Sequence, residues 1–383
     1  MTVLAAVVRH LTFPLLFQEG MSAETELTPL DPSGWMPRAI TFGAGGVRII
    51  CQLGVYAAIY DAGLTVHVTD WYGCSGGAVC AFFAALGVGT RWIRDCIAIL
   101  DLHLVGKASE ELVLDYMNTW GVNSGEALIE FLGRFADTWE PGSSLWTFAD
   151  FARERPGVNL HIIATNISRG CQSIFNATNT PAVRVLDAVR ASSGIPLFFT
   201  PWRSPEGEIF CDGAMIETYP WLCVKNKDDT LVIISSDKDI KRFHGTDTIL
   251  PPPTSLPEYL SRIFYTMRRG HVTALTTPKH WIAVNNKDVS IFDFGVTSEQ
   301  RERMFAEGEL AGREWIAFMR VRCATTPQSP HVCVPPNTSW ASGHPEPDKK
   351  LDSHQSLIHS PPPQKYHFQD SQTRRSRDRR WSL

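Results

Sequence analysis

The sequence predicts an α/β protein with a central, mainly parallel sheet flanked by helices. Three observations lead to this prediction. Strand-like and helix-like segments alternate from residue 39 onward, which is typical of a parallel sheet covered on both faces. The segment TLVIISS, residues 230–236, has an unbroken apolar middle, as strands buried on both faces do. The chain has 383 residues, 44% of them hydrophobic, and can therefore bury a large core.

The first half of the pattern consists of two strand-helix units. Residues 39–42 predict a short buried strand, and GAGG follows as a loop. A helix then runs to Gly63, the residue type that best tolerates the left-handed conformation beyond a helix end. LTVHVTD, residues 64–70, alternates apolar and polar residues and predicts a second strand, followed by a helix over 76–86.

The second half adds helices and further strands. Helical stretches are expected around 90–105, 108–120 and 124–154. We expect a hairpin in which NLHIIATNI pairs with QSIFNAT. The remaining expected elements are a helix over 186–194 stopped by Gly194 and Pro196, strands over 207–214 and 230–236, and a mainly helical part over 251–322 that contains one strand, HWIAVNN.

Composition divides the chain into four parts: a weakly ordered leader (1–37), the motif-bearing α/β domain (38–222), a mostly helical continuation of it (223–322), and a Pro-rich, basic tail that we expect to be disordered (323–383). The apolar arm at the N-terminus has its charge at Arg9, inside the apolar run, unlike a signal peptide. The apolar run over 78–88 is far shorter than the roughly 20 residues of a spanning helix.

Charge and cysteine content narrow the function class. The net charge of −4 gives the folded part no basic field, so we expect no nucleic-acid partner. The nine cysteines are scattered, without metal-ligand spacing, and fit a reducing compartment. We therefore predict an intracellular, cytoplasmic protein without metal or organic cofactor, with any membrane contact local and peripheral; the oligomeric state is left open.

Residues 73–77, GCSGG, match the GxSxG pattern between a strand and a helix. A nucleophile on such a sharp turn needs small neighbours, and Gly73, Gly76 and Gly77 provide the room. The same string also fits a serine that only caps a buried helix. The choice between the two depends on the rest of the chain.

Two further motifs support the nucleophile. GAGGVR, residues 43–48, opens a helix and can present backbone N–H groups to an anion, either a phosphate or an oxyanion. It lacks the pattern of a nucleotide-binding loop, which favours the oxyanion. CDGA, residues 211–214, places Asp212 at a strand end, where a desolvated carboxylate could take a hydroxyl proton.

Together the three motifs, in this order, resemble the patatin-like phospholipase family over residues 39–222. The blocks ATN (164–166) and ASSGIPLFFTP (191–201) also look like the family. The resemblance implies a three-layer patatin-like α/β fold and a Ser–Asp dyad made of Ser75 and Asp212, with Gly45, Gly46 and Arg48 in the oxyanion and substrate-binding region. The matching motif positions are Ala44, Gly45, Gly46, Val47 and Arg48 in the loop, Gly73 to Gly77 in the elbow, and Asp212, Gly213 and Ala214.

Two positions depart from the family pattern. Ala44 and Ile49 stand where glycines are usual. Alanine is harmless at a negative φ and costly at a positive one. Ile49 predicts tighter packing at the helix start. We interpret Cys74 and His67 as structural residues, and Phe82, Phe83, Phe198 and Phe199 as core, although 198–202 could border an acyl channel.

The prediction is therefore a lipid acyl hydrolase that cleaves fatty-acyl esters of phospholipids, lysophospholipids or acylglycerols at a membrane or droplet surface. Arg48 could orient the loop, meet a lipid phosphate or form a structural ion pair. Two alternatives stay open. One is a Ser–His–Asp hydrolase with His244, His271 or His280 as base. The other is a non-catalytic lipid-binding or scaffold protein of the same fold.

Overall fold

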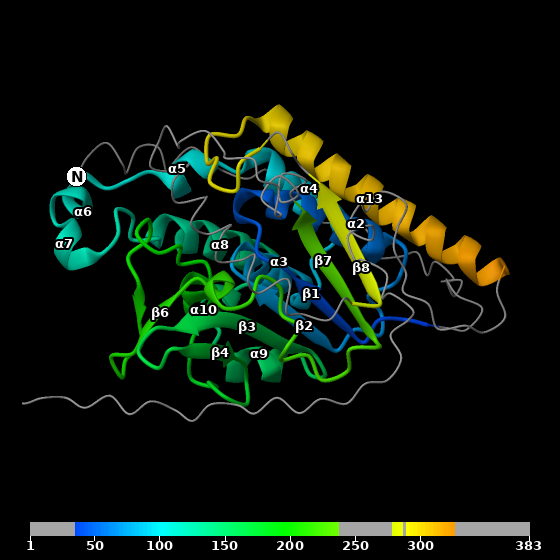
Figure 1. The fold of residues 1–383 in the computed structure, drawn as a ribbon, viewed down its shortest axis with the longest axis horizontal. Helices are drawn as coiled ribbons and strands as arrows, with labels where there is room; N and C mark the ends of the chain where they lie inside the picture. Colours follow the sequence, from blue (N-terminus) through cyan, green and yellow to red (C-terminus); the bar gives the residue numbers. More distant parts are fainter. Residues whose placement is uncertain (1–34, 237–277, 286–288, 326–383) are drawn as a thin grey trace, which may run out of the picture. The chain divides into compact units, whose positions relative to one another are not determined.

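The structure is a computed structural model that describes residues 35–236, 278–285 and 289–325. Most of the predicted leader, the tail from residue 326, most of the helical stretch from 251 to 279, and both His244 and His271 lie outside the described residues. Within the described part, eight strands form one sheet in the order β5-β6-β3-β2-β1-β7-β8, and β4 pairs with β3 beside this path (Figure 1).

The strands and helices alternate as the sequence predicts, and the α/β class is confirmed. The strands are β1 (Ala39–Phe42), β2 (Asp70–Cys74), β3 (Asn159–Asn166), β4 (Cys171–Phe175), β5 (Trp202–Arg203), β6 (Ile209–Cys211), β7 (Thr230–Ser236) and β8 (His280–Asn285). The helices are η1 (Gly46–Arg48), α2 (Ile49–Asp61), α3 (Gly76–Ala85), α4 (Thr90–Ile99), α5 (Leu102–Gly106), α6 (Glu110–Leu114), α7 (Tyr116–Thr119), α8 (Glu126–Trp139), η2 (Ser143–Leu145), α9 (Phe148–Glu154), α10 (Val185–Ser192), η3 (Gly213–Met215) and α13 (Ser298–Thr325).

The sheet is parallel over its centre and antiparallel at one side. β3, β2, β1, β7 and β8 are parallel neighbours, whereas β4 and β6 run antiparallel to β3. α2 and α3 contact the central strands and each other, α10 contacts β3 and α3, and α13 packs along α2. The C-terminal ends of the parallel strands therefore lie together at one end of the sheet, where α/β proteins bind their ligands.

The register of β3 explains how distant parts of the chain meet. β4 pairs with residues 162–166 of β3 along one edge. β2 pairs with residues 159–163 and β6 with residues 165 and 166, so both must use the other edge, one after the other. Since β2 is parallel to β3 and β6 is antiparallel, their C-terminal ends point toward each other. The residues that follow them, Ser75 and Asp212, arrive at one point.

Close approach of α13 to α2 depends on glycines. A Cβ on Gly308 would lie 2.0 Å from the carbonyl oxygen of Cys51, and one on Gly54 would lie 2.1 Å from that of Phe305. Arg301 of α13 also donates to the carbonyl oxygens of Ile97 and Ala98 near the end of α4. α13 is therefore a built-in part of the α/β unit.

Several predicted boundaries are wrong. The second strand begins at Asp70, not Leu64, and residues 62–67 form turns. The alternating LTVHVTD pattern arises because this loop buries Leu64 and Val68 while Val66 stays 55% exposed. His67 accordingly lies exposed in a turn and not on a strand.

The helical stretches are also more divided than expected. The stretch 124–154 is interrupted at Gly142, whose φ of 84° is left-handed, and α9 starts at a capping box of Thr147 and Asp150. The stretches 90–105 and 108–120 each form two short helices. The short strand β5 was not predicted, and α13 extends to Thr325, past the expected start of the tail at 323.

Candidate active site

Ser75 lies on the sharp turn between β2 and α3 with φ 56° and ψ −133°, a conformation that side chains rarely adopt. Its neighbours have no room for a side chain. A Cβ on Gly73 would lie 2.5 Å from the carbonyl oxygen of Gly77, and one on Gly77 would lie 2.4 Å from that of Phe42. The glycines thus permit a strained turn that projects the serine hydroxyl.

The hydroxyl of Ser75 donates to Oδ2 of Asp212 at 2.6 Å, across 137 residues of sequence. The other carboxylate oxygen, Oδ1, accepts the backbone N–H of Ala214 at 2.8 Å. The backbone of Asp212 is fixed as well, because its N–H donates to the carbonyl oxygen of Gly194 and its own carbonyl accepts the Thr165 hydroxyl. The hydroxyl is therefore directed at a carboxylate that is held in place.

Burial changes the acidity of Asp212. The side chain is 2% exposed, and desolvation raises its pKa to about 6, against the lowering effects of the hydrogen bonds from Ser75 and Ala214. A carboxylate with this pKa is ionised at neutral pH and is a stronger base than an exposed aspartate. It can accept a proton from a hydroxyl that attacks a carbonyl.

Two neighbouring serines hold the backbone of the elbow. The Ser192 hydroxyl accepts the N–H of Ser75 at 2.9 Å and donates to the carbonyl oxygen of Ile163 at 2.5 Å. The Ser193 hydroxyl donates to the carbonyl oxygen of Ser75 at 3.0 Å. Sequence reasoning identified the block ASSG but assigned these two side chains no role. The run of two serines before a helix-ending glycine was the available indication.

The loop before α2 places two backbone amides beside the elbow. Ala44 N–H donates to Thr218 and Val47 N–H to Ile291, whereas no acceptor in the described part of the chain pairs with the amides of Gly45 and Gly46. A Cβ on Gly76, next to the serine, would lie 3.4 Å from the nitrogen of Gly46. The amides of Gly45 and Gly46 therefore have no acceptor among the described residues, and that of Gly46 lies beside the elbow.

Each of the two departures from the family pattern has a structural account. Ala44 is not among the non-glycine residues with positive φ, so its methyl group causes no backbone strain. The Cγ2 atom of Ile49 lies 2.4 Å from where a Cβ of Gly76 would be. Ile49 therefore packs against the glycine after the nucleophile and tightens the start of α2.

Arg48 lies 4% exposed, with its Nε donating to the carbonyl oxygen of Val289 at 2.5 Å. Behind the same loop, the buried Gln52 donates to the carbonyl oxygen of Gly43 and to the hydroxyl of Ser235. Gln52 had not been predicted from the sequence. Both side chains bind the loop to neighbouring segments of the fold.

The turn after β6 fits closely against the elbow. A Cβ on Gly213 would lie 2.3 Å from the carbonyl oxygen of Ile163 and 2.9 Å from Sγ of Cys74. The Cys74 thiol donates to the carbonyl oxygen of Glu217, on the side away from the hydroxyl of its neighbour. Cys74 is thus a packing residue of the elbow, and Gly213 allows Asp212 to approach it.

His280 lies far from the elbow. In the register of the sheet, His280 is in one row with Leu231, Ile40 and Trp71 on successive strands. Its ring stacks on that of Trp35, with the ring centroids 3.9 Å apart. Trp71 precedes Ser75 by four residues, so His280 is separated from it by roughly 13 Å along the strands and by three strands across. His280 is therefore not a partner of Ser75.

An apolar cavity of about 80 Å³ begins beside the elbow. Its lining includes Ile49 and Val79 and the aromatic rings of Phe83, Trp92 and Phe135. The residues that complete its lining are Ile50, Leu53, Ile93, Cys96, Ile97, Leu100, Leu102, Val105, Leu128, Phe131 and Leu132. Of the predicted core phenylalanines, Phe82 is fully buried and Phe198 stacks on Phe294.

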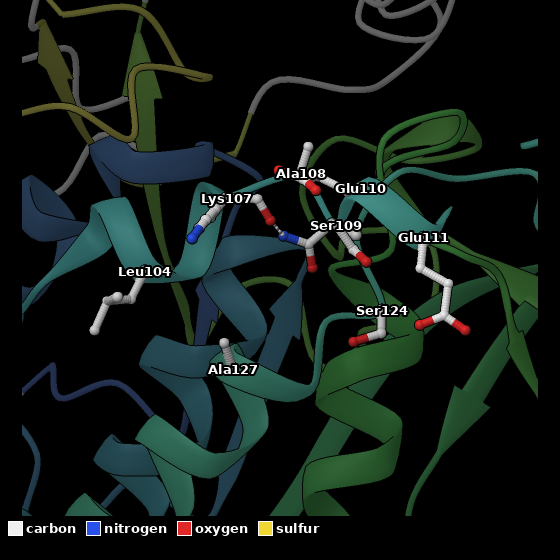
Figure 2. Close-up of a pocket in the computed structure, with 9 residues that line it drawn as sticks. Leu104, Lys107, Ala108, Ser109, Glu110, Glu111, Ser124 and Ala127 are labelled. Carbon is white, nitrogen blue, oxygen red and sulfur yellow. Dashed lines mark hydrogen bonds between the residues drawn. The ribbon is translucent and has the colours of Figure 1, made fainter. Parts of the chain in front are cut away.

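A larger open cavity of about 420 Å³ lies between the end of α5 and the starts of α6 and α8 (Figure 2). Leu104, Lys107, Glu111 and Ser124 are among its lining residues, and it contains neither Ser75 nor Asp212. Across the residues that the structure describes, no three His, Cys, Asp or Glu side chains gather as metal ligands would. The same residues include no helix with the length and hydropathy of a membrane span.

Comparison with known proteins identifies the family. Residues 40–223 match the family described as patatin-like phospholipase. The chain is 22% identical over 286 residues to the uncharacterized protein R571 of Acanthamoeba polyphaga mimivirus, covering 73% of this chain and 94% of that protein. It is 23% identical over 184 residues to the probable lipid hydrolase 463L of Invertebrate iridescent virus 6, covering 48% of this chain and 61% of that protein.

Two solved structures are similar in fold. VipD from Legionella pneumophila superposes with a TM-score of 0.46 at 15% identity, covering 75% of this chain and 69% of VipD. The type III effector ExoU of Pseudomonas aeruginosa superposes with a TM-score of 0.41 at 16% identity, covering 74% of this chain and 53% of ExoU. Residues 40–223 are therefore a domain of the patatin-like phospholipase family, a family of lipid ester hydrolases.

Proposed function

We propose that the protein hydrolyses fatty-acyl esters of phospholipids, lysophospholipids or acylglycerols with Ser75 as nucleophile and Asp212 as base. The observation that carries the proposal is the 2.6 Å hydrogen bond from the Ser75 hydroxyl to Asp212, at a strained turn beside two open amides. A helix-capping serine would direct its hydroxyl at the amides of its own helix. The hydroxyl of Ser75 is directed at the carboxylate instead.

The reaction begins when Ser75 Oγ attacks the acyl carbonyl and Asp212 takes its proton. The amides of Gly45 and Gly46 donate to the oxyanion of the tetrahedral intermediate. Collapse of this intermediate breaks the ester bond, and the protonated Asp212 returns the proton to the leaving alcohol. Water, deprotonated by Asp212, then attacks the acyl-serine. The second tetrahedral intermediate collapses, the fatty acid leaves, and Asp212 returns the proton to Ser75 Oγ.

Arg48 acts in this proposal as a residue that positions the loop. Its buried contact with Val289 supports this role over contact with a lipid phosphate. The apolar cavity behind Ile49 and Val79 offers a place for the first part of an acyl chain. The cavity is small, at about 80 Å³, so a long chain requires its lining side chains to separate.

The experiment compares wild type with Ser75→Ala and Asp212→Asn on a panel of phospholipid, lysophospholipid and acylglycerol substrates. Both variants should lose at least about 10³-fold in kcat/KM, because each removes an obligatory partner of the same step. A fluorophosphonate ester should label wild type and the matched control Ser168→Ala but not Ser75→Ala. Thermal unfolding of each variant checks that the fold is retained.

The two alternative functions give different outcomes in the same experiment. Full activity of Asp212→Asn, together with loss of activity in a His244 or His271 variant, would indicate a Ser–His–Asp enzyme. Absence of any adduct on Ser75 in folded wild-type protein would indicate a non-catalytic lipid-binding protein. Action at a membrane or droplet surface follows from the insolubility of the substrates and belongs to this proposal.

A further inference from the structure

The helices α6 and α7 expose apolar side chains to an unusual degree. Leu114 is 89% exposed, Met117 83% and Val113 51%, and neither helix has a buried residue. Val113 and Leu114 end α6, and Met117 lies in α7, so the three side chains gather at the junction of the two helices. Trp120, 45% exposed, follows α7 and donates its ring N–H to the carbonyl oxygen of Met117.

Backbone strain marks the same region. Within the described residues, three non-glycine residues have positive φ: Ser75, Trp120 at 58° and Leu197 at 68°. Leu197 is itself 50% exposed. Strained conformations of this kind cost about 1–3 kcal/mol each and concentrate at functional sites. Trp120 and Leu197 hold their side chains partly in solvent, so burial within the chain does not offset the free energy of their strained backbone.

This region is directly connected to the dyad. The Tyr116 hydroxyl donates to the carbonyl oxygen of Leu197, and the N–H groups of Val122 and Asn123 donate to that of Phe198. Leu197 follows Gly194 by three residues, and the carbonyl of Gly194 accepts the N–H of Asp212. One short segment therefore joins the catalytic aspartate to the exposed apolar residues.

The charges on these helices restrict the partner. Residues 109–120 contain Glu110, Glu111 and Asp115 and no lysine or arginine. An anionic surface would be repelled by three carboxylates. One cation, Arg203, contacts this region, with its guanidinium 5.0 Å from the Trp120 ring centre. A partner without net charge, into which apolar side chains can insert, fits this composition.

We propose that Val113, Leu114, Met117, Trp120 and Leu197, the α6–α7 surface, insert into the surface of a lipid layer without net charge. This proposal rests on the proposed function, because an enzyme that takes its substrate from such a layer needs a docking surface near the dyad. Docking there brings the segment before Asp212 to the lipid. Tryptophan at the edge of the surface suits the interface, where one side of the ring is apolar and the other wet.

The experiment measures binding of the full chain to phosphatidylcholine vesicles in the Ser75→Ala background, so that no lipid is consumed. Leu114→Ser and Met117→Ser should each weaken the partition coefficient about tenfold, and the double variant more. Leu145→Ser, at a side chain 70% exposed on η2, is the matched control and should bind unchanged. Binding should not depend on salt concentration, and phosphatidylglycerol should not strengthen it.

The proposal fails if the double variant binds vesicles as the control does, or if it changes the oligomeric state of the protein instead. It also fails if binding requires anionic lipid. Wild type and the surface variants should hydrolyse a water-soluble short-chain ester equally, since none of these residues belongs to the catalytic machinery. Loss of vesicle binding with this activity intact would show that the α6–α7 surface acts in binding and not in catalysis. An inactive wild type that still binds vesicles would contradict the proposed function and leave the binding proposal standing.

Discussion

At the scale of single residues, the loop at residues 43–48, the proposed oxyanion loop, depends on one glycine and tolerates one alanine. Gly46 has φ 53°, and a Cβ there would lie 2.0 Å from the carbonyl oxygen of Ile291. Ala44, two residues earlier, has an ordinary backbone conformation. A glycine is therefore required at position 46, whereas alanine is tolerated at position 44.

Gly46→Ala and Ala44→Gly should have opposite outcomes. Gly46→Ala forces the backbone away from Ile291, misplaces an oxyanion donor and should lower kcat by about 10²-fold to 10³-fold. Ala44→Gly should keep kcat and lower the free energy of unfolding by about 0.5–1 kcal/mol, since glycine loses more backbone entropy. Steady-state kinetics on a soluble ester and urea unfolding measure both. Equal loss of kcat in the two variants would contradict this account.

The raised pKa of Asp212 predicts the pH dependence. The aspartate is a base only when ionised, so kcat/KM should fall tenfold per pH unit below about 6 and level off above it. Because the folded-state pKa lies above the unfolded one, the stability that Asp212 contributes is present at low pH and lost as the pH rises through 6. Asp212→Asn should therefore gain stability over wild type at pH 8 and match it near pH 4. A flat rate profile down to pH 5 would argue against Asp212 as the base.

At the scale of secondary structure elements, α2 and α13 pack so closely that their backbones touch through glycines. Gly308 faces the carbonyl oxygen of Cys51, and a Cβ on Gly312 would lie 2.7 Å from Cβ of Ala58. α2 in turn begins at the oxyanion loop, with Ile49 against Gly76. α2 thus contacts α13 along its length and begins at the loop of residues 43–48, so the packing of α13 helps to fix where that loop lies.

Gly308→Val should lower the free energy of unfolding by about 3 kcal/mol, because backbone atoms cannot move aside for the new side chain. Ala317→Val adds branching on the exposed face of the same helix and should cost only a few tenths of a kcal/mol. Urea unfolding of both variants provides the measurement. Similar losses in the two would show that α13 does not pack tightly on α2.

The same scale shows where sequence reasoning succeeds and fails. Segments with a strong pattern, such as the apolar run TLVIISS and the helix from Ser298, are found where predicted. The loop 64–69 imitates a strand because it alternates Leu64, Val66 and Val68 without ladder partners. The short helices α6 and α7 have no buried residue to mark a face, so periodicity alone could not separate them.

At the scale of the whole molecule, the sheet brings together residues that are remote in sequence. β2 and β6 end head to head on one edge of β3, and this places Ser75 against Asp212. Motif order identified the two residues, but nothing in a three-residue strand such as β6 reveals its partner. The supports of the site, Ser192, Ser193 and Gln52, were missed for a related reason, since their roles are defined by contacts and not by pattern.

The segment 289–291 also determines when, during synthesis of the chain, the loop before α2 can be held in place. Val289 and Ile291 hold Arg48 and Val47 of the oxyanion loop, and the contact between Arg48 and Val289 spans 241 residues. During translation at about 5–20 residues per second, the loop waits roughly 12 to 48 seconds for these partners. Under the proposed function, a nascent chain that already carries Ser75 therefore lacks the contacts that hold this loop until residues 289–291 have been made.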